Sequence, residues 1–291
     1  MAGFPAYARG IPALDTERAL PRGRWDPRYY QIATLASLLA YGIGWLDLEV
    51  QAVQAGAILA TVLLAQYAGT MIVGLPGGYD PRSALISGLS LCLLLRTSSL
   101  ALAVVTAVLA IASKFAIRWQ GKHVFNPTNV ALVAMLGATG AVWVSPGQWG
   151  SLAVFAFLLA AAGGLVVNRA ARSDVTVAFL AAWAAIVVGR SLWLGEPLAI
   201  PLHRLENGAL VLFAFFMISD PKTTPDSRAG RILFAVLVAL GAGFVQFRLF
   251  RTNGLLWSLA VCSVLTPLID RLLSGPRYAW TGHGAGHRRS A

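Results

Sequence analysis

The chain has 291 residues, of which 57% are hydrophobic and only 12% are charged, and its mean hydropathy is +0.68. Soluble domains carry about 25% charged residues, so this composition excludes an ordinary soluble protein and places most of the chain in lipid. The net charge of +11 comes from arginines scattered over loops and tails, without interleaved aromatic residues, which argues against nucleic-acid binding. Two isolated cysteines, Cys92 and Cys262, lie in apolar runs, as is typical of buried hydrophobic side chains.

Apolar segments separated by short polar stretches follow one another along the chain. Ten can be counted, at 29–46, 50–75, 84–95, 98–117, 128–144, 150–168, 173–194, 205–219, 230–250 and 254–270. A crossing of the bilayer takes roughly 20 apolar residues, and the third and eighth segments are clearly shorter. We predict an all-α, polytopic membrane protein with about ten transmembrane helices, some of them short and broken.

The distribution of basic residues predicts the orientation of these segments. With ten crossings, 18 of the 23 lysines and arginines fall on the side that holds the N-terminus. Basic loops mark the cytoplasmic side of a membrane protein. We therefore expect both tails, residues 1–28 and 272–291, in the cytoplasm, and the protein itself in a bacterial inner membrane as a multi-pass protein.

The two halves show the same order of segment lengths. Each short segment is followed by a long one, an Asn-containing turn and a marginal segment, although literal sequence identity between the halves is slight. Five segments per half is an odd number, so two similar halves would face opposite ways in the membrane. We predict two inverted five-helix repeats, at residues 29–145 and 146–271.

The stretch from Leu205 to Arg231 is the first candidate site. Only thirteen residues separate Glu206 from Asp220, too few for a crossing, and the apolar run ends in Asp220-Pro221. Backbone groups freed by a broken helix are tolerated at membrane depth only where protein or a cavity satisfies them, and such breaks hold binding sites. Asp220 and Asp226 could form a proton or cation site, because ionisable groups within a membrane are costly and usually functional. Alternatively, Asp220 lies at the water interface and only joins a proline turn, and the positive-inside count favours this interpretation for Asp226.

The second candidate site is the stretch KFAIRWQGKHVFNPTN, which runs from Lys114 to Asn129. Asn126-Pro127 is typical of the start of a helix, because Asn caps free N–H groups and proline is tolerated at the first helical position. This helix start is either only a well-capped end after a basic loop, or the place where an anionic or carbonyl-rich ligand meets free N–H groups.

Other kinds of site have no support in the sequence. His123 and His203 are isolated, His283 and His287 lie in a glycine-rich tail, and no spacing predicts a metal site. The GxSxG, Walker, GxGxxG and HExxH motifs are absent from the sequence. We predict no catalytic residue from these motifs.

Three stretches resemble the RnfD/NqrB family of membrane subunits of Rnf and sodium-pumping NADH:quinone oxidoreductase complexes. They are FNPTNVALVAM at Phe125–Met135, FFMISDPKTTPDSRAGRILF at Phe215–Phe234 and LTPLIDRLLSGPRY at Leu265–Tyr278. The resemblance covers the last two thirds of the chain and is closest to a minimal, divergent or stand-alone RnfD-like member. It implies two inverted five-helix halves similar to urea transporters, bound flavin, and electron transfer coupled to ion movement.

Covalent flavin is not expected. Family members with covalent FMN attach it to a threonine of a Ser/Thr-Gly-Ala-Thr motif in an outer loop, and here that loop is reduced to about residues 145–150. The Gly-Ala-Thr at Gly137–Thr139 follows Leu136 and is expected inside the fifth helix. The resemblance therefore implies FMN or riboflavin held non-covalently.

Three functions stay open at this point. A redox subunit would anchor flavin through polar groups and aromatic rings: Lys114, Asn126, Asn129, Asp220, Lys222 and Thr224, with Phe125 and Trp119 for stacking. A urea-transporter-like channel or carrier would instead move a small solute without redox activity. A scaffold would dock other redox subunits through its basic cytoplasmic face.

Overall fold

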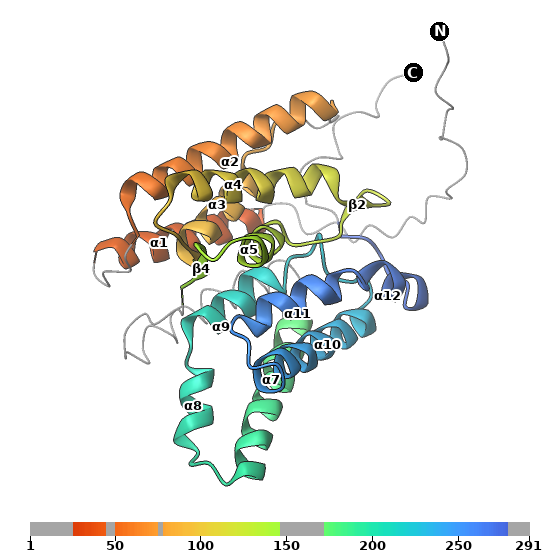
Figure 1. Ribbon diagram of the computed structural model, residues 1–291. Coiled ribbons are helices and arrows are strands. Elements are labelled where there is room, and N and C mark those ends of the chain that lie inside the picture. The colour runs from red at the N-terminus through yellow and green to blue at the C-terminus, as the bar shows by residue number, and fades with distance from the viewer. Residues whose placement is uncertain (1–25, 45–49, 75–77, 146–171, 279–291) are drawn as a thin grey trace.

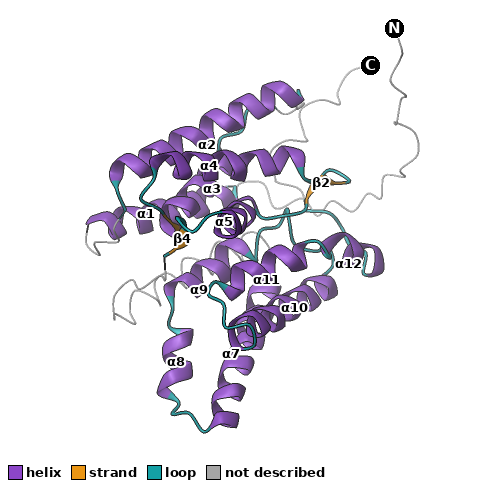
Figure 2. Cartoon of the chain, viewed as in Figure 1, coloured by secondary structure: helices purple, strands orange, loops and turns teal. Residues whose placement is uncertain are grey.

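The computed structural model describes residues 26–44, 50–74, 78–145 and 172–278, and these are mostly helical (Figures 1 and 2). The first half contains α1 (Pro27–Gly44), α2 (Ala52–Val73), α3 (Arg82–Leu94), α4 (Leu100–Ala116) and α5 (Pro127–Ala138). The second contains α7 (Ser173–Leu194), α8 (Ala199–Leu205), α9 (Gly208–Leu212), the π-helical turn η1 (Phe213–Met217), α10 (Arg228–Phe247), α11 (Gly254–Ser263) and α12 (Thr266–Leu272).

Two small antiparallel ladders connect the helices. β1 (Leu95–Arg96) pairs with β4 (Trp143–Val144), which ties the end of α3 to the segment after α5. β2 (Arg118–Trp119) and β3 (Lys122–His123) form a hairpin between α4 and α5. Figure 1 shows the hairpin and α12 at the end of the bundle opposite β4.

Several helices are long and apolar enough to cross a membrane. Among the described residues α2, α7 and α10 meet this condition singly, and α11 with α12 forms a fourth candidate that bends by 52° at a short break. Many large apolar side chains on these helices are exposed, for example Ile72 and Leu240, as expected for surfaces that face lipid. The prediction of a helical membrane protein is confirmed.

The predicted segments agree with the helices in position. The short third and eighth segments are confirmed, because α3 has 13 residues and α9 with η1 covers only Gly208–Met217. The fifth segment, expected to reach residue 144, ends as a helix at Ala138, because Trp143 and Val144 pair as strand β4 with β1. α8 was not predicted, and the sixth segment lies outside the described residues.

Local sequence explains where the helices begin and end. Ser99, Asn126 and Ser227 cap α4, α5 and α10 by accepting a hydrogen bond from a backbone N–H group of the first turn. α2 and α7 end at Gly74 and Gly195, whose φ angles of 63° and 68° suit glycine.

Helix packing follows one pattern in the two halves. α4 packs against α2 and α5 in the first half, and α10 packs against α7 and α11 in the second. The short α3 lies against α1 and α2. It packs tightly against α2 at Gly88, where a Cβ atom would lie 2.7 Å from Val62 Cγ2 and 3.1 Å from Leu59 Cδ2.

We expect Gly88→Ala to destabilise the protein by about 1–3 kcal/mol, the usual cost of overpacking a tight helix contact. Gly56→Ala is the matched control, because Gly56 also lies in a helix, α2, but a Cβ atom there meets nothing within 4 Å. The control should be neutral or slightly stabilising, since alanine favours helix over glycine. Thermal unfolding in detergent measures both, and equal midpoints for the two variants would contradict the α2–α3 contact.

Candidate functional site

A cavity of about 230 Å³ lies between the two halves of the chain. Its walls come from the starts of α1 and α5, the ends of α4 and η1, the middle of α2, one face of α3 and the β2–β3 hairpin. The cavity therefore collects segments that are far apart in sequence, including both stretches predicted as candidate sites. We refer to it as the inter-half pocket.

Asp220 organises the wall that the second half contributes. Its backbone carbonyl accepts hydrogen bonds from the N–H groups of Thr223 and Thr224, both at 3.1 Å, and from the Thr224 hydroxyl at 3.1 Å. Its Oδ1 accepts the Lys222 N–H at 3.0 Å. One residue thus satisfies the donors of a tight turn directly after the short helix, which is the structural role foreseen as an alternative.

The second carboxylate oxygen of Asp220 faces the first half. Asn126 Nδ2 lies 3.4 Å from Asp220 Oδ2 and 3.5 Å from the carbonyl of Met217. Asn126 Oδ1 meanwhile accepts the Asn129 N–H at 3.1 Å and so caps α5. The Asn126 side chain therefore caps its own helix and contacts the end of the short helix from the other half.

Lys114 brings a cation into the same pocket. It is 4% exposed near the end of α4, and its Nζ donates to Gln66 Oε1 of α2 at 2.8 Å. Gln66 is itself buried within a helix long enough to cross the membrane. A buried ammonium group needs such partners, and Lys114 and Asp220 both line the pocket without forming a direct ion pair.

The loops around the pocket carry further titratable groups. Burial raises the pKa of Asp220, and the Lys222 N–H and nearby lysines oppose that rise. Burial also lowers the pKa of His123 to about 3, and the positive charges of Arg118, Lys114 and Lys222 add to this effect. His123 Nδ1 has no hydrogen-bond partner among the described residues, so a neutral imidazole is available at the pocket wall.

Half of the predicted site residues line this pocket, namely Lys114, Asn126, Asp220 and Lys222. Trp119 is instead exposed at the hairpin, and Phe125 is half-buried outside the lining. Asn129 is buried and donates to the carbonyl of Leu256 at 3.2 Å, while Thr224 is buried in the Asp220 turn. Ligand binding by any of these residues stays a prediction.

Sequence reasoning missed several residues of the pocket. Gln66, Arg28 and Asp80 contribute to its lining, and His123 was set aside as an isolated histidine. A glutamine inside an apolar run of helix length was the one available signal, since polar groups in membrane helices are costly. The Arg28 side chain could not be placed from sequence, because it pairs with Asp80, 52 residues away, at 2.6 Å.

Two groups of ion pairs hold the second half at this end of the bundle. Lys122 Nζ of the hairpin lies 2.9 Å from Asp226 Oδ1 and 2.8 Å from Asp270 Oδ2. Arg231 of α10 pairs with Asp174 of α7 at 2.5 Å. Asp226, considered as a possible ion site from sequence, is thus engaged in a contact between the hairpin and the second half.

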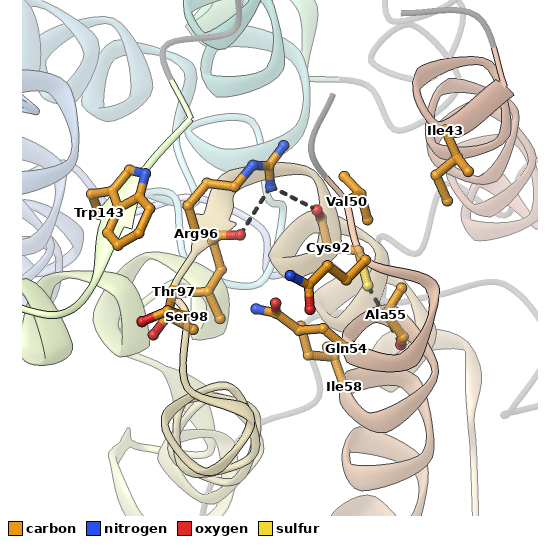
Figure 3. Close-up of a pocket in the computed structure, with 12 residues that line it drawn as sticks. Ile43, Val50, Gln54, Ala55, Ile58, Cys92, Arg96, Thr97, Ser98 and Trp143 are labelled. Atoms are coloured by element: carbon orange, nitrogen blue, oxygen red, sulfur yellow. Dashed lines mark hydrogen bonds between the residues drawn. The ribbon is translucent and has the colours of Figure 1, made fainter. Parts of the chain in front are cut away.

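A larger cavity of about 530 Å³ lies on another face of α3 (Figure 3). Gln51 and Gln54 of the α2 start and Thr97 and Ser98 after β1 provide polar groups, and Trp143 stands at its side. Arg96 Nη1 donates to the carbonyls of Cys92 at 3.1 Å and Leu95 at 2.9 Å, which satisfies the end of α3.

Thr139, considered for covalent flavin, lies one residue beyond the end of α5. α5 ends at Ala138, and Thr139 is the C-cap residue in extended conformation. Its hydroxyl donates to the carbonyl of Met135 at 3.1 Å. The expectation that Thr139 lies inside the helix is therefore wrong, although its hydroxyl is still engaged by the last helical turn.

The apolar helices and the buried pocket between them define a multi-pass membrane protein. Residues 138–278 match the model of the NQR2, RnfD, RnfE family. This match includes Asp220, Lys222 and the closing Leu265–Tyr278 stretch, whereas Lys114 and Asn126 precede it. Just under half of the chain is therefore similar to the NQR2, RnfD, RnfE family.

The chain is also similar to individual proteins that carry a name. The chain is 30% identical over 147 residues to the D subunit of the ion-translocating oxidoreductase complex of Erwinia tasmaniensis, a match that covers 50% of this chain and 37% of the relative. The corresponding proteins of Escherichia coli O9:H4 and Shigella flexneri serotype 5b are 30% identical over 131 residues, with 45% of this chain and 35% of each relative covered. The chain thus spans little more than a third of these relatives.

The lowered pKa of His123 leads us to predict that the stability of the protein depends on pH. Its pKa of about 3 in the folded chain lies below the usual value of about 6.5. As the pH falls from 7 to 5, the unfolded chain binds a proton that the folded chain does not, which costs about 1–2 kcal/mol of stability. His123→Gln should lose this part of the acid sensitivity.

Thermal unfolding in detergent at pH 7 and pH 5 measures the difference between wild type and variant. His203→Gln is the control, because His203 is exposed on α8 and outside the pocket; it should behave like wild type. An unchanged acid sensitivity in His123→Gln would show that His123 is not held neutral by its surroundings.

Proposed function

We propose that this chain is the membrane subunit of an ion-translocating electron-transport complex and holds a flavin non-covalently in the inter-half pocket. The observation that carries the proposal is the meeting of Asn126 from the first half with Asp220 from the second in one buried polar cavity. Binding sites of this kind form where broken helices from two repeats meet. The family match and the names of the relatives support the redox context.

The groups that line the pocket suit part of a flavin. Lys114, Lys222 and the Asn126 amide provide donors, and Phe115 and Phe216 provide aromatic surface, as the carbonyl edge and the faces of an isoalloxazine ring require. The enclosed volume of about 230 Å³ is below the roughly 300–1,000 Å³ of sites that enclose a drug-sized ligand. The residues thus fit the polar edge of the ring, and the remainder would extend through the mouth of the pocket.

When bound, flavin supplies one-electron and two-electron chemistry. The protein would orient the ring through Asn126 and Lys114, and Asp220 would keep the turn beside it fixed. Gln66 would hold the Lys114 ammonium group in position through their 2.8 Å hydrogen bond. The surrounding apolar side chains would exclude water from the ring.

The proposal includes the membrane arrangement predicted from the sequence. Ten crossings in two inverted repeats agree with the matching order of contacts, in which α4 packs on α2 and α5, and α10 on α7 and α11. Both termini would then lie in the cytoplasm of a bacterial cell, with the hairpin and the Asp220 turn on the same side. Other redox subunits would dock at this face.

One observation favours a second candidate function. The 530 Å³ cavity beside the start of α2 offers amide and hydroxyl groups on a different face of α3 from the inter-half pocket (Figure 3). Two cavities separated by a short helix are what a urea-transporter-like channel or carrier for a small polar solute would need.

Absorbance of the detergent-purified protein separates these functions. A redox subunit should show flavin bands, and acid precipitation should release the flavin into the supernatant because no covalent bond retains it. Colour in the pellet would contradict non-covalent binding. A colourless protein that FMN and riboflavin do not reconstitute would favour the channel or carrier.

Two variants test the pocket itself. Asp220→Asn keeps the Oδ1 acceptor for the Lys222 N–H but removes the charge and the Oδ2 acceptor that meets Asn126. Asn126→Ser keeps a cap for α5 but removes the amide donor. Each should weaken FMN or riboflavin retention at least about tenfold, the effect of losing a charged or buried hydrogen bond. Flavin fluorescence during titration of the apoprotein measures this.

Asn207→Ser is the matched control, because Asn207 caps α9 through Oδ1 in the same way but is exposed and outside the pocket. All three variants should remain inserted in the membrane. Their free energies of unfolding should differ from that of the wild type by no more than about 1 kcal/mol. Wild-type flavin affinity in both pocket variants would show that the site is assigned wrongly.

A further inference from the structure

The β2–β3 hairpin lies at one end of the bundle (Figure 1), and Trp119, Gln120 and Gly121 at its turn are exposed. Its turn, Gln120-Gly121, has φ angles of 50° and 81°, which are typical of the tight turns that suit the twist of a hairpin. The ladder is extended by the hydrogen bond from the Val124 N–H to the Ile117 carbonyl at 3.4 Å.

Two arginines from the C-terminal part of the described chain contact this hairpin. Arg277 donates from Nη1 to the Gln120 carbonyl and from Nη2 to Gln120 Oε1, both at 2.9 Å. The Arg271 guanidinium stacks over the Trp119 ring, with 5.6 Å between its Cζ and the ring centroid. Two arginines and one tryptophan are thereby held together at the tip of the hairpin.

The charge at this tip is only partly balanced by nearby acids. Lys122 pairs with both Asp226 and Asp270, so that with Arg271 and Arg277 the group has three positive and two negative charges. Within the part of the chain that the structure describes, neither Arg271 nor Arg277 forms an ion pair. The tip therefore presents net positive charge and guanidinium N–H groups to its surroundings.

Apolar side chains border the same place. Trp119 is 46% exposed, Ile117 between α4 and the hairpin is 38% exposed, and Leu272 at the end of α12 is 74% exposed. α4 itself exposes Val105, Val108 and Leu109, so its outer surface suits lipid. The hairpin begins where this apolar surface ends, which is the level at which tryptophan and arginine occur in membrane proteins.

We propose that Trp119, Arg271 and Arg277 form a binding site for the headgroup of an anionic phospholipid. The arginines would contact the headgroup phosphate, because a planar guanidinium matches phosphate geometry, and Trp119 would lie at the boundary of headgroups and acyl chains. The Gln120–Arg277 contact would hold the cations in place. This site is separate from the inter-half pocket and does not depend on flavin binding.

Quenching of tryptophan fluorescence by brominated lipids tests the proposal. The full chain is reconstituted into phosphatidylcholine vesicles that contain the same fraction of either brominated phosphatidylglycerol or brominated phosphatidylcholine. The Trp119 contribution is the difference between wild type and Trp119→Phe. We expect phosphatidylglycerol to quench it with about fivefold preference, the gain for one arginine at an anionic surface.

Arginine variants connect the preference to the named residues. The double variant Arg271→Gln/Arg277→Gln should lose the preference, and Arg271→Lys/Arg277→Lys should retain most of it because the charge remains. The matched control Arg248→Gln/Arg251→Gln removes two exposed arginines from the segment between α10 and α11 and should keep the wild-type ratio. Loss of the preference in this control would show a non-specific charge effect and overturn the site.

Other outcomes overturn the proposal in distinct ways. Equal quenching by the two lipids would mean that Trp119 meets the bilayer without recognising charge. Absence of quenching by either lipid would place the tip clear of the membrane and favour an acidic protein partner. Binding of inorganic phosphate by the detergent-solubilised chain, together with no preference for phosphatidylglycerol in vesicles, would identify a site for free phosphate instead of a lipid.

Discussion

A helix of ten residues cannot cross a bilayer, and its last carbonyls must find donors without help from water. Here the donors come from neighbouring groups: the Ile218 N–H bonds the Phe213 carbonyl, and the Thr176 and Ser219 hydroxyls bond the carbonyls of Ala214 and Phe215. The Met217 carbonyl accepts from the Asp220 N–H and from the Asn126 amide, which comes from the other half and also meets Asp220 Oδ2. Satisfying the end of a short helix and building a pocket between the halves are therefore one arrangement of groups.

The contacts around this turn show how a membrane protein can keep charged groups near its interior. Cations and carboxylates are shared among several elements: Lys122 joins the hairpin to Asp226 and Asp270, Arg231 joins α10 to Asp174, and Arg28 joins the start of α1 to Asp80. Of these ion-paired residues, Arg28 and Asp80 line the pocket, whereas Lys122 and Arg231 join elements outside its lining.

The sequence predicted the helices well because apolar runs and their breaks are local features. Asn126-Pro127 and Asp220-Pro221 were recognised as helix ends for the same reason, and the structure brings them together. Gln66, Arg28 and His123 could not be assigned to the pocket, because their position depends on helix packing and on contacts over long stretches of chain, such as the 48 residues between Gln66 and Lys114. Trp119 differs from them, since it lies near the pocket in sequence but is exposed at the hairpin and absent from the pocket lining.

The π-helical turn at Phe213–Met217 has a consequence for how this part of the chain tolerates length changes. The Ile218 N–H bonds the Phe213 carbonyl, so this turn holds one residue more than an α-helical turn. Losing a residue here would convert the turn to α-helix and leave the phase of Ser219 and Asp220 unchanged relative to α9. The same loss within α10 would rotate every later side chain by about 100° around the axis.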